Sequence, residues 1–204
     1  MNKLIIILIF LFSVTITYAQ LLPGETKSSS RKNRISDNEL VNKFYAGISA
    51  KAANSIDQWG LDIGLNFGAT LSNHFALGGS FHTLLTQNVK ILPDYPYFLR
   101  FDYGGLEPQF IFKFSEFAFH IKTLIGIGFA GYSQNVNFDT LSDLNGDWIF
   151  VSEPSLGLDY ILDNSLWISV DLGWRQTAGV DFKNIGNEAL NGPVVCISLK
   201  SVVF

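Results

Sequence analysis

Apolar and polar residues alternate along most of the chain after residue 43. In the segment 59–71 every odd position is apolar and every even position is Gly or polar, and the segments 117–129 and 166–175 follow the same pattern closely. A helix would mix the two sets around its circumference, whereas a strand sends them to opposite faces. These segments are therefore predicted to be strands with one apolar and one polar face.

Eight such strands account for the whole alternating region. They are expected near residues 44–53, 59–71, 75–87, 97–114, 117–131, 148–162, 166–176 and 193–204. Several are longer than strands of soluble proteins and reach the ~9–11 residues of a tilted strand that crosses a membrane. The pattern predicts an all-β fold, an eight-stranded antiparallel up-and-down transmembrane β-barrel.

The links between the predicted strands alternate in length. Three of them are tight turns, at 71–75, 114–117 and 162–166. The links on the other side are longer, namely 54–58, 88–96, 132–147 and 177–192, of which the first is only moderately long. Outer-membrane barrels have short periplasmic turns and longer outer loops. We therefore expect both termini in the periplasm and the longer links outside.

The strand 97–114 changes its pattern in the middle. Leu99, Phe101 and Tyr103 are apolar at odd positions, whereas apolar residues after Leu106 fall on even positions. One extra residue in a strand reverses which face its side chains take. A bulge at Gly104-Gly105 is therefore predicted, and it would turn these polar residues to the lumen: Arg100, Asp102, Glu107, Gln109 and Lys113.

The apolar face is predicted to point outward to lipid. It comprises Leu61, Ile63, Leu65, Phe67, Phe110, Phe112, Ile121, Ile125, Ile127, Leu156, Leu158, Val170 and Leu172. Aromatic residues gather near both ends of the strands, as membrane interfaces favour. The inner face of a soluble β-sandwich also alternates, but that alternative leaves the strand lengths and the aromatic belts unexplained.

The opposite face carries a nearly balanced set of acids and bases. We predict a lumen charge network of Asp62, Glu107, Lys113, Lys122, Glu153, Asp159, Asp171, Arg175 and Lys200. The lumen of an eight-stranded barrel is filled by side chains, and an isolated buried charge is costly, so these charges are expected to pair. Such a network is preferred to a conducting path or a catalytic cluster.

The N-terminal region has a different character. An apolar run, Leu4–Phe12, is followed by small and polar residues, and this predicts a signal peptide over 1–19 with cleavage between Ala19 and Gln20. Residues 20–43 are polar and rich in Ser, Lys and Arg, which predicts a flexible leader. The expected organisation is a signal peptide (1–19), a leader (20–43) and a barrel (44–204).

Composition agrees with a barrel and narrows the choice of partners. The chain has 18 Phe and 18 Gly, only 16% charged residues and a formal net charge of −4. The net charge gives no reason to expect nucleic acid as a partner. The single Cys196 cannot form an internal disulfide.

With its Thr17–Gln20 export site, its strand pattern and its terminal Phe204, the chain resembles the small eight-stranded outer-membrane barrels. This class includes the OmpA transmembrane domain, OmpX and the PorT-like proteins. The resemblance covers 44–204 and implies residence in the cell outer membrane of a Gram-negative bacterium. It also implies contact with outer-membrane lipid and with the barrel-insertion machinery that reads the terminal aromatic residue.

Candidate catalytic and metal motifs are weak. Asp143–Asp147 resembles the start of a calcium loop, but Trp148 and Pro154 stand where Gly and Glu are required. The three histidines fall at separate places in the predicted barrel, so no Ser/His/acid set is expected outside. We expect no enzyme activity, no cofactor and no metal, but a structural or accessory envelope role with loops or leader contacting another envelope protein. A narrow pore and a lipid-modifying enzyme are the alternatives.

Overall fold

The computed structural model describes residues 43–86, 89, 98–133, 145–163, 165–182 and 185–203. The barrel strands are β1 Phe44–Ser55, β2 Gln58–Thr70, β3 Phe75–Leu84, β4 Phe98–Phe114, β5 Phe117–Ser133, β6 Asn145–Ile161, β7 Leu166–Ala178 and β10 Gly192–Val203. Between β7 and β10 lie three short elements, β8 Asp181–Phe182, β9 Ile185–Gly186 and the 3-10 helix η3 Asn187–Leu190. No helix among the described residues is long and apolar enough to span a bilayer.

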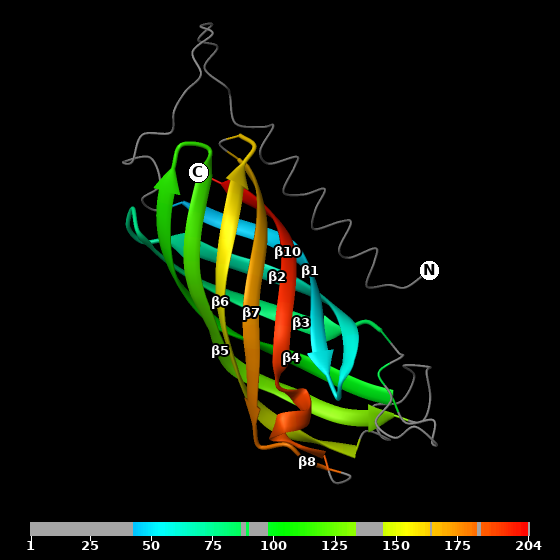
Figure 1. Cartoon of the computed structure of the whole chain (residues 1–204). Coiled ribbons are helices and arrows are strands. Elements are labelled where there is room, and N and C mark those ends of the chain that lie inside the picture. The colour runs from blue at the N-terminus through cyan, green and yellow to red at the C-terminus, as the bar shows by residue number, and fades with distance from the viewer. Residues whose placement is uncertain are drawn as a thin grey trace, which may run out of the picture. The chain divides into compact units, whose positions relative to one another are not determined.

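Each barrel strand pairs with its sequence neighbour in antiparallel fashion, and β1 lies beside β10 so that the barrel closes (Figure 1). The eight-stranded antiparallel barrel predicted from the alternation is confirmed. The small β8–β9 hairpin and η3 were not predicted, because two-residue strands and a single helical turn carry no readable periodicity. The predicted signal peptide, the leader up to residue 42 and Phe204 lie outside the described residues.

The two faces of the strands differ as the pattern indicates. All thirteen apolar residues assigned to the outward face are exposed, for example Phe67 at 60% and Leu172 at 61%. The interior holds charged side chains, and those of Arg175 and His120 are completely buried. An apolar outer surface around a polar interior is the inverse of a soluble protein and is typical of a membrane barrel.

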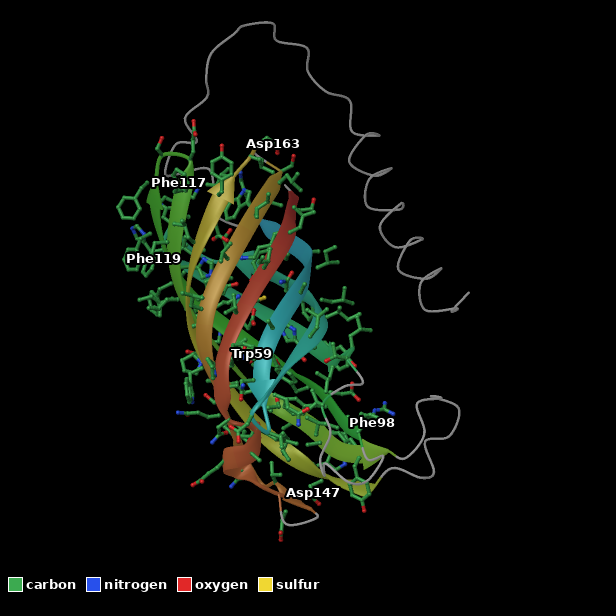
Figure 2. The ribbon with its side chains drawn as sticks, turned by 45° about the vertical axis from the view of Figure 1, so that its right-hand side comes forward. Trp59, Phe98, Phe117, Phe119, Asp147 and Asp163 are labelled. Carbon is green, nitrogen blue, oxygen red and sulfur yellow. The ribbon has the colours of Figure 1, made fainter. Side chains whose placement is uncertain are left out.

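Short turns join the strands at one end of the barrel. Figure 2 shows Phe117 and Asp163 at this end, and Phe98 and Asp147 at the opposite, loop end. The Asp163 carboxylate accepts hydrogen bonds from the backbone N–H groups of Ser165 (2.7 Å) and Leu166 (2.9 Å). These bonds stabilise the ionised form and lower the pKa of Asp163 below its usual value. This turn therefore loses stability as the pH falls through that lowered pKa.

The link between β1 and β2 is shorter than predicted. Instead of a moderately long loop over 54–58, Ser55 pairs with Gln58, and only Ile56 and Asp57 form the turn. Both residues have positive φ, 54° and 57°, which is the geometry of a type I′ hairpin turn. A β-branched residue rarely adopts this conformation. Ile56 is held in it because its N–H donates to the Ala189 carbonyl at 2.5 Å and its side chain packs on buried apolar residues.

Replacing Asp57 by glycine is expected to stabilise the barrel by about 1 kcal/mol, because glycine adopts positive φ without the steric cost that other residues meet. Urea unfolding in detergent micelles, followed by tryptophan fluorescence, measures this change. Asp57→Ala is the matched control, since it removes the same carboxylate but keeps a Cβ. A gain of equal size in both variants would show that loss of the charge, and not the turn geometry, is responsible.

The predicted bulge in β4 is wrong. Gly104 pairs with Phe81 on one side and with Ile127 on the other, and Gly105 pairs with Ser80 and Gly126, so the register runs one for one through this point. Odd positions of β4 therefore face inward along its whole length. Leu99, Phe101 and Tyr103 lie in the interior, and Arg100 and Asp102 lie on the outer surface instead of in the lumen. The reason is that the interior is apolar, not polar, at this end.

Two prolines inside strands, Pro108 in β4 and Pro154 in β6, interrupt the strand pairing without a bulge. Pairing between β4 and β5 stops after Leu106 and resumes at Gln109 in the same register, and the pairing between β6 and β7 behaves likewise around Pro154. Proline has no N–H to donate, so the ladder is interrupted at each site, but no residue is inserted.

Candidate functional site

One group of charged side chains fills the interior near the short turns. We call this the turn-side cluster, and it consists of His120, Lys122, Asp159, Ser169, Asp171 and Lys200. The His120 ring lies between two carboxylates, with Nδ1 2.9 Å from Asp159 and Nε2 2.5 Å from Asp171. Two ionised carboxylates can only accept, so the doubly protonated imidazolium satisfies both.

Two lysines complete the turn-side cluster. The ammonium of Lys122 donates to Asp171 at 3.1 Å, and that of Lys200 donates to Asp159 at 3.2 Å. Ser169 also donates to Asp159. The members come from four strands, β5, β6, β7 and β10, and each carboxylate has two cationic neighbours. The cluster therefore cross-links the barrel internally.

A second group lies nearer the middle of the interior. We call it the central cluster, and it consists of Lys51, Asp62, Tyr103, Glu153 and Arg175. Lys51 forms a 2.5 Å ion pair with Glu153 and donates to the Tyr103 hydroxyl at 3.0 Å. The same hydroxyl donates to Glu153 at 3.1 Å. These bonds connect β1, β4 and β6 across the lumen.

Arg175 joins the central cluster to the loop end. Its guanidinium donates to the backbone carbonyls of Leu190 (3.0 Å) and Asn54 (3.1 Å) and to the Ser55 hydroxyl (2.5 Å). Its Nη1 lies 3.5 Å from Asp62, and its plane lies 4.6 Å from the ring centroid of Phe101. Planar, multiple donation of this kind is specific to arginine.

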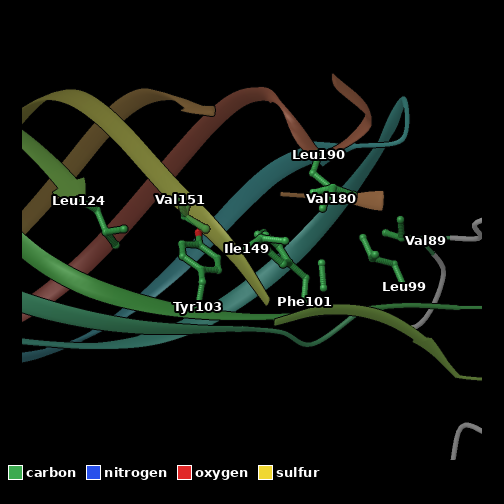
Figure 3. Close-up of a cluster of buried hydrophobic side chains, with 10 residues drawn as sticks. Val89, Leu99, Phe101, Tyr103, Leu124, Ile149, Val151, Val180 and Leu190 are labelled. Atoms are coloured by element: carbon green, nitrogen blue, oxygen red, sulfur yellow. The ribbon is translucent and has the colours of Figure 1, made fainter. Parts of the chain in front are cut away.

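Apolar side chains close the interior at both ends. At the loop end is the apolar plug, shown close up in Figure 3. It is formed by Val89, Leu99, Phe101, Tyr103, Leu124, Ala130, Ile149, Val151, Val180 and Leu190. At the turn end is a cap of Tyr45, Ala76, Ile111, Ala118, Ile161, Trp167 and Val202. Between them, a cavity lined by Lys51, His82 and Glu107 measures only about 10 Å³. That is room for about one water molecule.

The structure places eight of the nine residues of the predicted lumen charge network in the buried interior. Glu107 accepts a hydrogen bond from Ser80 at 3.0 Å. Lys113, the ninth, is half-buried on the inward side, with its ammonium 5.7 Å from the Trp167 ring centroid. Sequence reasoning missed Lys51 and Tyr103. The alternation of β1 does point to Lys51, but its small residues make the pattern faint, and the mistaken bulge turned Tyr103 outward.

The arrangement offers little to a reacting substrate. His120 contacts two carboxylates and no nucleophile, and it is fully buried. Among the residues that the structure describes, no group of three or more His, Cys, Asp or Glu could hold a metal ion. The Asp143 end of the calcium-like motif lies outside the described ranges. The interior chemistry is that of a static ion-pair network.

Comparisons with known proteins show which solved structures share this fold. No protein-family model matches the chain, and no curated protein matches its sequence. Neisserial surface protein A is similar in structure, with a TM-score of 0.56 and 12% identity over 79% of this chain and 95% of that one. The outer-membrane protein OprG of Pseudomonas aeruginosa gives a TM-score of 0.51 with 12% identity, over 80% of this chain and 96% of that one.

A third solved structure is Ail, the attachment invasion locus protein of Yersinia pestis, in complex with the heparin analogue sucrose octasulfate. It has a TM-score of 0.50 and 12% identity, over 80% of this chain and 99% of that one. At such identities the similarity concerns the fold. The chain has the fold of the small outer-membrane β-barrels.

Proposed function

We propose that the chain is an integral outer-membrane protein with a structural or accessory role in the cell envelope, and that it is neither a transporter nor an enzyme. It contacts outer-membrane lipid through its outward face and is inserted by the barrel-insertion machinery. Its termini lie in the periplasm, and its longer links face outside. Through these links or its leader it contacts another envelope protein.

The observation that carries the proposal is a sealed interior inside an apolar outer surface. The outward side chains suit hydrocarbon and would be costly in water. Between the apolar plug and the turn-end cap, the described side chains of the two charged clusters fill the lumen around a cavity of water size. A permeating solute would have to displace buried ion pairs, which supports a role without transport.

The lengths of the turns and links support the proposed orientation. The three turns after β2, β4 and β6 lie at the same end as the start of β1 and the end of β10, and outer-membrane barrels keep their short turns in the periplasm. The links at the other end include 85–97 and 134–144, which are long enough to project from a membrane.

The charge at the loop end favours a particular kind of partner. Carboxylates outnumber lysines and arginines in the links at this end, and the described ones include Asp57, Asp181 and Glu188. The Yersinia pestis protein was solved with a polysulfated heparin analogue. An acidic loop end repels such a polyanion, so we propose for this chain a protein partner that presents basic residues.

The proposal predicts the behaviour of the full-length protein expressed in a Gram-negative host. It should fractionate with the outer membrane, migrate faster on gels before boiling than after, and give no steady conductance in planar bilayers. An open porin reconstituted in parallel provides the positive control for conductance. Recovery in the periplasm without a heat-dependent shift would contradict membrane insertion, and stable single-channel steps would contradict the sealed interior.

A further inference from the structure

On the outer surface of the described barrel strands, one charged pair stands among uncharged side chains. Among the outward positions of the eight barrel strands, as far as the structure describes them, Arg100 and Asp102 are the only charged residues. Arg100 Nε donates to Asp102 Oδ2 at 2.8 Å, and the Thr83 hydroxyl donates to the other carboxylate oxygen. Their side chains are 33% and 20% exposed. A charged pair facing lipid is unfavourable unless something polar lies against it.

The pair lies at the level of the aromatic belt near the loops. Strand register places Asp102 beside Thr83 on one side and Phe129 on the other, and Phe129 beside Trp148. The Phe129 and Trp148 rings pack edge to face with centroids 6.0 Å apart. Aromatic belts mark the level of lipid headgroups, where the cost of a charge falls to about 0–1 kcal/mol. Arg100 is two residues closer to the loops than Asp102, at headgroup height.

A groove runs from this pair toward the middle of the barrel wall. It has a volume of about 590 Å³, within the usual range of ligand sites, and it is lined by Phe81, Arg100, Asp102, Tyr103, Gly104, Ile127, Gly128, Phe129 and Trp148. Gly104 forms its floor, because strand register sets Phe81 and Ile127 on either side of a residue without a side chain. One end of the groove is thus charged, and the rest is apolar.

This arrangement matches an amphiphile with an anionic head. Asp102 engages only the Nε of Arg100, and among the described residues no hydrogen bond is made by the two terminal nitrogens of the guanidinium. A guanidinium edge with two parallel donors is suited to a phosphate group. The apolar length of the groove then lies where the acyl chain of that lipid would run.

We propose that this groove is a lipid-binding site that holds one phosphate-bearing lipid of the leaflet nearest the loops, with its phosphate on Arg100 and one acyl chain over Gly104 between Phe81 and Ile127. The assignment to a leaflet rests on the orientation proposed above. The binding of the lipid phosphate and acyl chain does not rest on that orientation, because it depends on the folded barrel alone.

Native mass spectrometry of the folded barrel, extracted from membranes in a non-ionic detergent, tests the site. Phosphatidic acid should form a one-to-one adduct, and diacylglycerol with the same acyl chains should bind about tenfold more weakly, the loss expected for one charge-assisted hydrogen-bonding group. Inorganic phosphate at the same concentration should not displace the lipid. Equal binding of the two lipids, displacement by phosphate alone, or a protein dimer in place of the adduct would overturn the proposal.

Two substitutions distinguish lipid binding from a merely structural ion pair. Arg100→Gln should weaken phosphatidic acid binding about tenfold, whereas Asp102→Asn should leave it unchanged or strengthen it, because a carboxylate beside the phosphate is removed. If the pair served only to hold the strands, both variants would change binding alike, and that result would contradict the site. The heat-dependent gel shift confirms that each variant is folded before it is measured.

A second pair of substitutions tests whether the apolar part of the groove binds the acyl chain. Ile127→Trp places a large ring in the groove and should weaken both lipids, whereas Leu172→Trp makes a similar change on exposed β7 and should weaken neither. Substitution of Gly104 is unsuitable, because a Cβ there would lie 2.8 Å from the Ser80 carbonyl and would strain the strand pair itself. Failure of the lipid experiments with a normal gel shift and outer-membrane fractionation would reject the site and leave the proposed function standing.

Discussion

Replacing Arg175 by methionine is expected to destabilise the barrel by about 3–5 kcal/mol, the usual cost of removing one partner from a buried ion pair. The guanidinium is fully buried and donates to Asn54, Ser55 and Leu190 while it lies beside Asp62. Methionine has similar length but no donor, so two carbonyls and a carboxylate lose their partner. Urea unfolding in detergent micelles or lipid vesicles, followed by tryptophan fluorescence, measures the change.

Two further variants test the reason for this loss. Arg175→Lys keeps the charge but lacks the planar fork, so it should lose an intermediate amount. Adding Asp62→Asn to Arg175→Met should recover part of the stability, because the double variant no longer leaves a buried charge unpaired. A change below 1 kcal/mol in Arg175→Met would contradict the central role of this side chain.

Asp171→Asn is expected to cost a similar amount, about 3–5 kcal/mol, because one carboxylate faces two cations in the turn-side cluster. The His120 ring lies 2.5 Å away and the Lys122 ammonium 3.1 Å away. Asparagine keeps the shape of the side chain but removes the carboxylate that Lys122 pairs with, and it leaves His120 with Asp159 as its only carboxylate partner among the described residues. The same unfolding measurement applies.

Ser169→Ala is the matched control within the same strand and cluster. It removes a neutral donor to Asp159 and leaves every charge in place. The expected cost is about 1.5–3 kcal/mol, the usual range for a hydrogen bond to a charged group, and so smaller than the loss of a buried charge. If Asp171→Asn and Ser169→Ala cost the same, the cluster would not depend on charge pairing.

Most of the fold is predictable from the sequence because the period-two pattern is nearly continuous. The outward apolar set, the three tight turns at 71–75, 114–117 and 162–166, and the order of the eight strands all follow from it. The two-residue β1–β2 turn cannot be predicted from local sequence, because Ile56 and Asp57 are not the residues that prefer a type I′ turn. Tertiary packing of Ile56 at the loop end prevails over that local preference.

The error in β4 has a physical origin. The apolar residues of β4 shift from odd to even positions along the strand. Either a bulge or an interior that becomes apolar at one end explains such a shift, and the local sequence does not distinguish the two. The choice is made by Val180 and Leu190, which follow β4 far along the chain and share the apolar plug with Phe101. Their contribution depends on the short elements between β7 and β10, which have no periodic signal.

For the interior, alternation identifies the charged residues but not their partners. It assigns Asp159 and Asp171 to the lumen, yet only the register of β5, β6 and β7 brings both carboxylates to His120. The groove on the outer surface could not be predicted because the bulge expected in β4 placed Arg100 and Asp102 in the lumen and Tyr103 outside. Once Arg100 is assigned to the lumen, it is no longer a candidate for contact with lipid.

The position of η3 directly before β10 has a consequence for the closure of the barrel. Leu190 and Val180 complete the apolar plug, while Arg175 ties Leu190 to Asn54 and Ser55 at the end of β1. Asn54 and Ser55 are at the end of β1, and β1 lies beside β10 in the closed barrel. The burial of Arg175 is therefore coupled to the closure of the barrel, because both need the first and the last strand side by side.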